Sequence, residues 1–267
     1  MTVTTERATT ANWSEPEGVA PRGTLIVIPG RGEGPELYER FGRRIAGDAY
    51  RVHVVSDPVG DPARTTSQVL ASTAEVRPYV LAGSDTGALF AAGLAASGRV
   101  GGADALVLAG LPTGPGSAGP ALSGPTAAGP AAAQPAGLGS WEDELAARTA
   151  CPTHRGRLAG PGLRRGALFE PAPAGWAALA DLDQVTVPVL ALHGAADPVS
   201  PLADARERYA RAPRVELVSI AGGVHDVLND ATHRTVAATI VLFLERLRLG
   251  ADLAPIAVSE QLNRAAP

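Results

Sequence analysis

The chain has 267 residues, of which 45% are hydrophobic, and a net charge of −4 at pH 7. This length suits a single α/β domain with one large core. The charge gives no basic face for nucleic acid or an anionic membrane, so we expect a small-molecule partner and leave a homodimer open. Cys151 is the one cysteine, which excludes an intrachain disulfide, and we expect no cofactor and no metal.

Residues 1–22 are polar and carry no apolar core of the signal-peptide type, so they are predicted to be a flexible N-terminal segment. The chain has no run that approaches the roughly 18 apolar residues of a membrane helix. We therefore expect a soluble, cytoplasmic protein. Residues 251–267 are predicted to be a C-terminal tail.

Short apolar runs separated by helical patterns predict a doubly wound α/β core over residues 23–111 and 187–250. The runs lack polar alternation, which is typical of parallel strands buried on both faces. The predicted strands are 24–28, 51–55, 79–82, 105–108, 189–192 and 215–220. The predicted helices are 35–46, 65–74, 88–96, 201–210 and 235–249.

Residues 112–186 break this alternation and are predicted to be an insertion at the carboxyl side of the strands. Its first part, Pro112 to Ser140, is almost entirely Pro, Gly, Ala, Ser and Thr, which predicts a mobile loop. Helices are predicted at Trp141 to Ala150 and at Trp176 to Ala180. Because ligands of open α/β sheets bind at this edge, the insertion is a candidate lid, and a linker without a catalytic role is the alternative.

The segment Gly83-Ser84-Asp85-Thr86-Gly87 has the spacing of a nucleophile elbow, with aspartate where most elbows carry serine. Such elbows turn sharply between a buried strand and a helix, and small flanking residues are needed there. Asp197 follows the next-to-last predicted strand, and His225 follows the last one. The order nucleophile, acid, histidine is the order of the α/β-hydrolase fold.

Over roughly residues 23–249 the sequence resembles the α/β-hydrolase superfamily. Pro29-Gly30-Arg31-Gly32-Glu33, the segment 192–197 and the segment 223–225 are similar to monoacylglycerol lipase and lysophospholipase-type members. The resemblance implies a mostly parallel doubly wound sheet with an inserted, partly disordered lid. Two residues depart from it: Pro29 stands where those members usually have histidine, and Asp85 stands where they have serine. Aspartate at this position is the habit of haloalkane and haloacetate dehalogenases and of epoxide hydrolases, which commonly follow it with Trp or Arg; here Thr86 follows.

An ionised Asp85 can attack an electrophilic sp3 carbon without a base, forming an ester that water hydrolyses with help from His225, oriented by Asp197. The backbone N–H groups of Arg31 and Thr86 are the predicted oxyanion hole. A triad of Asp85, Asp197 and His225 therefore predicts hydrolysis through an aspartyl ester. Two alternatives stay open: a lyase, cyclase or isomerase of bacterial secondary metabolism that uses Asp85 and His225 as acid and base, and a non-catalytic ligand-binding protein.

Candidate substrate contacts are Gly30, Trp141, His154 and Trp176. The side chain of Arg31 has two open interpretations, because it could bind an anionic substrate group or point into solvent. His193 and Gly194 are predicted to shape the loop of Asp197.

Overall fold

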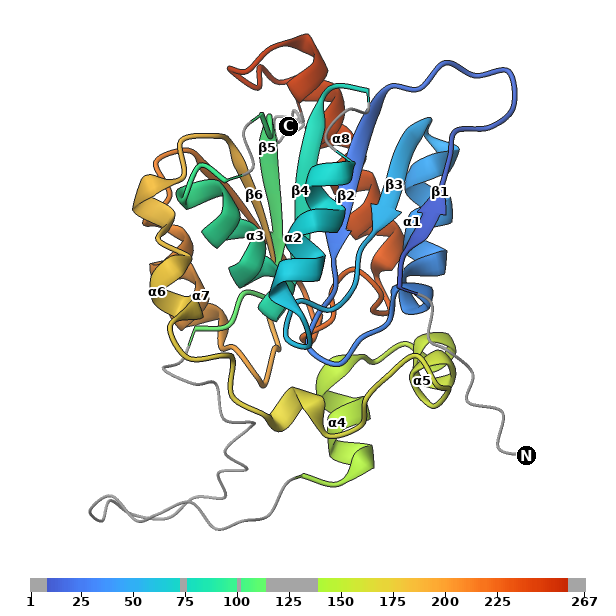
Figure 1. Cartoon of the computed structure of the whole chain (residues 1–267), viewed down its shortest axis with the longest axis vertical. Coiled ribbons are helices and arrows are strands. Elements are labelled where there is room, and N and C mark those ends of the chain that lie inside the picture. The colour runs from blue at the N-terminus through green and yellow to red at the C-terminus, as the bar shows by residue number, and fades with distance from the viewer. Residues whose placement is uncertain (1–8, 73–75, 100–101, 114–138, 259–267) are drawn as a thin grey trace, which may run out of the picture.

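The structure is a computed structural model, and it describes residues 9–72, 76–99, 102–113 and 139–258. Within these ranges the chain forms a seven-stranded sheet with the order β1-β3-β2-β4-β5-β6-β7 (Figure 1). Every neighbouring pair is parallel except β1 and β3. The strands are β1 (Ala11–Trp13), β2 (Gly23–Ile28), β3 (Tyr50–Val54), β4 (Tyr79–Ser84), β5 (Ala105–Ala109), β6 (Val189–Gly194) and β7 (Val215–Ile220). The predicted doubly wound sheet is confirmed.

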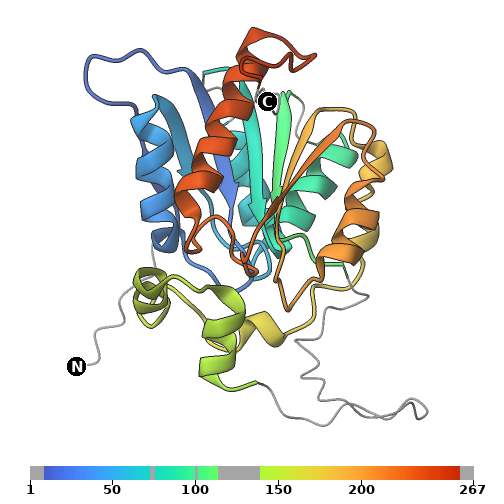
Figure 2. The same cartoon turned by 180° about the vertical axis from the view of Figure 1, so that it is seen from behind.

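Helices cover both faces of the sheet, which explains why the central strands are apolar throughout. They are η1 (Pro35–Tyr38), α1 (Glu39–Gly47), α2 (Pro62–Ala71), α3 (Thr86–Ala96), α7 (Leu202–Tyr209) and α8 (His233–Leu249). Helices α1 and α8 share one hydrophobic core with the sheet, on the side that Figure 2 shows. Helices α2, α3 and α7 share the core on the opposite side. The sheet is therefore buried between two apolar layers.

The segment 1–22 is predicted to be flexible, but residues 11–13 form the antiparallel edge strand β1. Ala11 pairs with Val54 and Trp13 with Val52. The indole of Trp13 packs on α1 so closely that a Cβ added at Gly42 would lie 2.1 Å from the ring. The Trp13 indole and the backbone hydrogen bonds to β3 therefore order residues 11–13, which their polar composition alone predicts to be flexible.

The described part of the insertion continues with α4 (Trp141–Arg148), α5 (Pro152–Leu158), η2 (Ala167–Phe169), α6 (Trp176–Leu179) and η3 (Leu182–Gln184). Helices α4 and α5 lie together beyond one end of the sheet in both views (Figures 1 and 2). This is the carboxyl end, because Glu33, which follows β2, forms a β-bridge with Leu163, and the N–H of His225, which follows β7, donates to Ala147. Residues 114–138, within the predicted mobile loop, lie outside the described residues.

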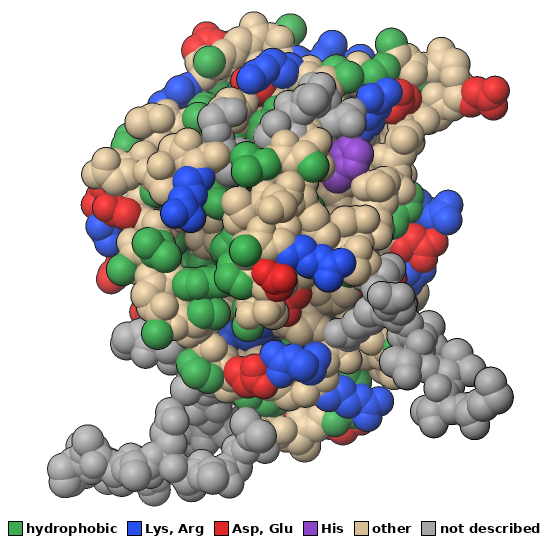
Figure 3. Space-filling model, in the orientation of Figure 1, with side chains coloured by type: hydrophobic (Ala, Val, Ile, Leu, Met, Phe, Trp, Pro, Cys, Tyr) green, Lys and Arg blue, Asp and Glu red, His purple; other side chains and the backbone are tan. Residues whose placement is uncertain are grey.

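The last part of the insertion packs on the side of the sheet rather than over its end. The rings of Trp176 on α6 and Phe90 on α3 have centroids 5.1 Å apart. Figure 3 shows hydrophobic side chains on this flank, where Leu179 is 66% exposed. Among the residues that the structure describes, no helix is long and apolar enough to cross a membrane.

Candidate functional site

Asp85 stands on a sharp turn between β4 and α3, as the Gly-x-Asp-x-Gly spacing predicts. Its backbone has φ 51° and ψ −123°, a conformation that non-glycine residues rarely adopt. A Cβ at Gly83 would lie 2.3 Å from the carbonyl oxygen of Gly87, and a Cβ at Gly87 would lie 2.2 Å from that of Ile28. The two glycines are therefore required by the packing of α3 against β4 and β2, and the turn presents Asp85 at the carboxyl end of the sheet.

The structure brings the predicted acid and histidine to Asp85. Nδ1 of His225 lies 2.8 Å from Oδ2 of Asp197, and Nε2 of the same ring lies 3.2 Å from Oδ1 of Asp85. The other oxygen of Asp197 accepts hydrogen bonds from the backbone N–H groups of Val199 and Ser200. His193 fulfils its predicted structural role, because its Nε2 lies 2.6 Å from the carbonyl oxygen of Ser200. The loop after β6 thus fixes one carboxylate oxygen and leaves the other to orient the imidazole.

The charges of these three side chains follow from their burial together. Burial by itself lowers the pKa of His225, but the carboxylates of Asp197 and Asp85 outweigh it and raise this pKa to about 10. Burial raises the pKa of Asp85, yet the Arg31 guanidinium and the His225 ring hold it well below the usual value. At neutral pH the site therefore contains an imidazolium between two carboxylates.

The side chain of Arg31 does not point into solvent, because it binds Asp85. Its Nε lies 2.7 Å from Oδ2 and its Nη2 lies 2.6 Å from Oδ1, a bidentate arrangement. The backbone N–H of Arg31, a predicted oxyanion donor, also donates to Oδ2 of Asp85 at 3.1 Å. Both side chains are buried, at 1% and 3% exposure. Each Asp85 oxygen is therefore engaged, and the aspartate occupies the predicted oxyanion position itself.

A second buried group of charges ties the insertion to the loop that carries Arg31. Arg148 on α4 reaches Glu33, with Nη1 2.6 Å from Oε1, and binds Glu144 on its own helix at 3.1 Å. Nη2 of Arg148 also donates to the backbone oxygen of Arg31 at 3.1 Å. Burial and the charge of Asp226 raise the pKa of Glu33 to about 8, against the opposing effect of Arg148. The sequence gives Glu33 only as part of a resemblance and gives Arg148 no role, because a pair 115 positions apart leaves no local pattern.

The candidate substrate contacts lie in different surroundings, and Gly30 is next to Asp85. Gly30 lies against the site, since a Cβ there would be 3.2 Å from Cβ of Asp85. Nε2 of His154 lies 3.0 Å from Oδ2 of Asp226, both residues are buried, and a substrate contact of His154 stays a prediction. Trp141 is half-buried, with the Arg165 guanidinium 4.5 Å from its ring centroid.

Trp176 packs on Phe90 of α3, and its role as a substrate contact stays a prediction. Thr86 begins α3, where its N–H has no acceptor within the helix, so its role as an oxyanion donor stays a prediction. In the part of the chain that the structure describes, no three His, Cys, Asp or Glu side chains are grouped to hold a metal ion.

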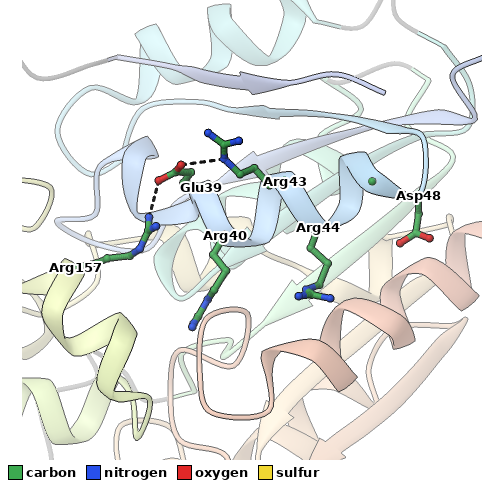
Figure 4. A pocket seen from close by; sticks show the side chains of 7 residues that line it. Glu39, Arg40, Arg43, Arg44, Asp48 and Arg157 are labelled. Atoms are coloured by element: carbon green, nitrogen blue, oxygen red, sulfur yellow. Dashed lines mark hydrogen bonds and ion pairs between the residues drawn. The ribbon is translucent and has the colours of Figure 1, made fainter. Parts of the chain in front are cut away.

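A groove of about 580 Å³ lies elsewhere on the surface, along α1 and α5 (Figure 4). Figure 4 shows Glu39 between Arg43 and Arg157, each 2.9 Å away, while Arg40 and Arg44 point to the other side of α1. None of the triad side chains lines this groove. The candidate functional site is therefore the carboxyl edge around Asp85.

Comparison with known proteins agrees with this fold. The family model described as serine aminopeptidase, S33, matches residues 157–232, less than half of the chain. A comparison with curated proteins finds none whose sequence matches.

The chain is similar in structure to a monoacylglycerol lipase from Paleococcus ferrophilus (TM-score 0.65, 17% identity, covering 87% of this chain and 97% of that one). It is also similar to a soluble variant of monoglyceride lipase from Saccharomyces cerevisiae in complex with a substrate analog (0.66, 13%, 89% and 91%). A third similar structure is a carboxyl esterase from Bacillus coagulans (0.60, 16%, 90% and 94%).

The sheet order, the elbow and these similarities define an α/β-hydrolase fold.

Proposed function

We propose that this protein hydrolyses a small organic molecule through an ester formed on Asp85. The observation that supports this most directly is the position of a carboxylate, rather than a hydroxyl, on the elbow within reach of His225 and Asp197. An ionised carboxylate attacks without losing a proton, so the first step needs no base.

In the first step an oxygen of Asp85 forms a bond to an sp3 carbon, and the leaving group departs with its electron pair. The product is a neutral alkyl ester. Because the Asp85 carboxylate is one of the two that raise the pKa of His225, its conversion to an ester lowers that pKa again. The imidazole then releases its proton more readily and can accept one from water.

In the second step the activated water attacks the carbonyl carbon of the Asp85 ester while His225 takes its proton. The ester bond breaks, and the alkoxide takes the proton held by His225 and leaves as the alcohol. The carboxylic acid of Asp85 then gives its proton to His225, which restores the carboxylate and the imidazolium. The proposed N–H groups of Arg31 and Thr86 stabilise the oxyanion of this step. Carboxylic esters fit this mechanism less well, because carboxylate attack on an acyl carbon gives an anhydride.

The variant His225→Gln tests this mechanism, because it blocks the second step and leaves the first intact. After incubation with 6-bromohexanoate or 3-phenyloxirane-2-carboxylate, we expect intact-mass and peptide analysis to show a stable adduct on Asp85. Asp85→Asn is the matched control and should carry none. If the native protein consumes a probe while His225→Gln carries no adduct, attack by Asp85 is excluded.

A second candidate is proton transfer without a covalent intermediate, as in an elimination or cyclisation. The bidentate bond to Arg31 supports it, because both Asp85 oxygens are already engaged. Single turnover in heavy-oxygen water separates the two candidates. Label in the Asp85 carboxylate supports the ester, and turnover without label supports proton transfer.

A further inference from the structure

The buried Arg31 forms an anion-binding seat that the protein fills with its own Asp85. Three donors converge on this carboxylate: Nε, Nη2 and the backbone N–H of Arg31, at 2.7, 2.6 and 3.1 Å. The planar fork of a guanidinium matches the two oxygens of a carboxylate, so the geometry selects this group over a single-point anion. Any reaction at an Asp85 oxygen requires that Asp85 break or share its hydrogen bonds to Arg31.

We propose that the substrate carries a carboxylate that replaces Asp85 on Arg31 and so frees Asp85 to react. This inference rests on the proposed function, because only a reaction at Asp85 makes the bound carboxylate compound a substrate. The exchange itself needs only the observed contacts, whether Asp85 then attacks carbon or moves a proton.

A buried guanidinium explains why the displacing group must be anionic. Arg31 is 1% exposed and a guanidinium is a cation in proteins, so a neutral substrate that separated Asp85 from it would leave this buried cation without its bidentate carboxylate. A carboxylate restores both hydrogen bonds of the fork and the charge pairing. The site therefore discriminates against neutral compounds at the moment of binding.

The surrounding contacts indicate that Asp85 moves and Arg31 stays. Nη1 of Arg31 donates to the backbone oxygen of Glu170, and its own backbone oxygen accepts from Arg148. Both partners belong to the insertion. Asp85 has the shorter side chain and retains a second cation, His225 at 3.2 Å, when it leaves Arg31. The carboxylate exchange thus leaves each negative group next to a positive one.

The test replaces the internal competitor. In Asp85→Asn the amide is neutral, so Arg31 loses its carboxylate partner and formate, the smallest carboxylate, should fill the seat. We expect calorimetric titration to give a formate Kd at least tenfold tighter for Asp85→Asn than for the native protein. Saturating formate should also raise the Tm of this variant by on the order of 5 °C. Formamide at equal concentration and sodium chloride at equal ionic strength serve as controls, and neither should raise the Tm of this variant.

The double variant Arg31→Gln/Asp85→Asn is the matched control and should lose the formate effect. Formate that acts no better than chloride on Asp85→Asn, or equally on the double variant, overturns the proposal. If Asp85→Asn does not fold, Asp85→Ser removes the same charge and must show the same effect. Adduct formation on Asp85 without formate binding rejects only the carboxylate site, whereas formate binding without adducts rejects only the nucleophile.

Discussion

The pair of Arg31 and Asp85 should show a large energetic coupling, because both members are buried. Asp85→Asn leaves a buried guanidinium without its carboxylate, which should lower the free energy of unfolding by about 3–5 kcal/mol. Arg31→Met should lie at the lower end of this range, because His225 and a backbone N–H still face the carboxylate. In the double variant neither charge remains, so the total loss should be about 2–3 kcal/mol smaller than the sum of the single losses.

Urea unfolding of the four proteins at pH 7, followed by circular dichroism, measures this coupling. Equal m-values across the set are the control that the unfolded states stay comparable. Single losses below about 1 kcal/mol are typical of ion pairs screened by water. Single losses this small, or losses that simply add in the double variant, would refute the interpretation that Asp85 and Arg31 form a buried ion pair without water.

Three further predictions concern other parts of the site. Since the pKa of His225 is raised from 6.5 to about 10, its proton stabilises the fold fully below pH 6.5, and this contribution is lost as the pH rises to 10. The native free energy of unfolding should therefore fall by up to about 1.4 kcal/mol more per pH unit between pH 7 and 10 than that of His225→Gln, and parallel urea-derived curves contradict this. Arg148→Met removes the guanidinium beside Glu33 and should cost about 3–5 kcal/mol in thermal or urea unfolding; a loss below 1 kcal/mol means that water replaces it. Gly87→Ala places a Cβ 2.2 Å from a carbonyl oxygen of β2 and should cost about 2–3 kcal/mol, whereas Gly156→Ala, with nothing within 4 Å, should not destabilise the protein.

Local patterns predicted the elements that carry the site. The apolar runs at 24–28 and 79–82 become β2 and β4, and each of the six predicted strands agrees with an observed one to within two residues at either end. The glycines around Asp85 also predicted the elbow, since the sharp turn leaves no room for a side chain at either position. The strands and the elbow depend on residues close together in the sequence, so local patterns are enough to predict them.

Features that depend on distant pairs were missed or left open. The strand Ala11–Trp13 exists because it pairs with β3 and packs on α1. The helix Pro152–Leu158 was not predicted, and its His154 pairs with Asp226, 72 positions further along the chain. Neither apolar periodicity nor composition reports such a pairing.

The sequence by itself determined an α/β-hydrolase fold with Asp85, Asp197 and His225 at the ends of three strands. This was determinable because parallel strands bring their carboxyl ends to one edge. Only the tertiary structure decided that the Arg31 side chain turns inward and binds both oxygens of Asp85. Nη1 of that long side chain donates to the backbone oxygen of Glu170 in the insertion, a contact between residues 139 positions apart that no local sequence pattern reports.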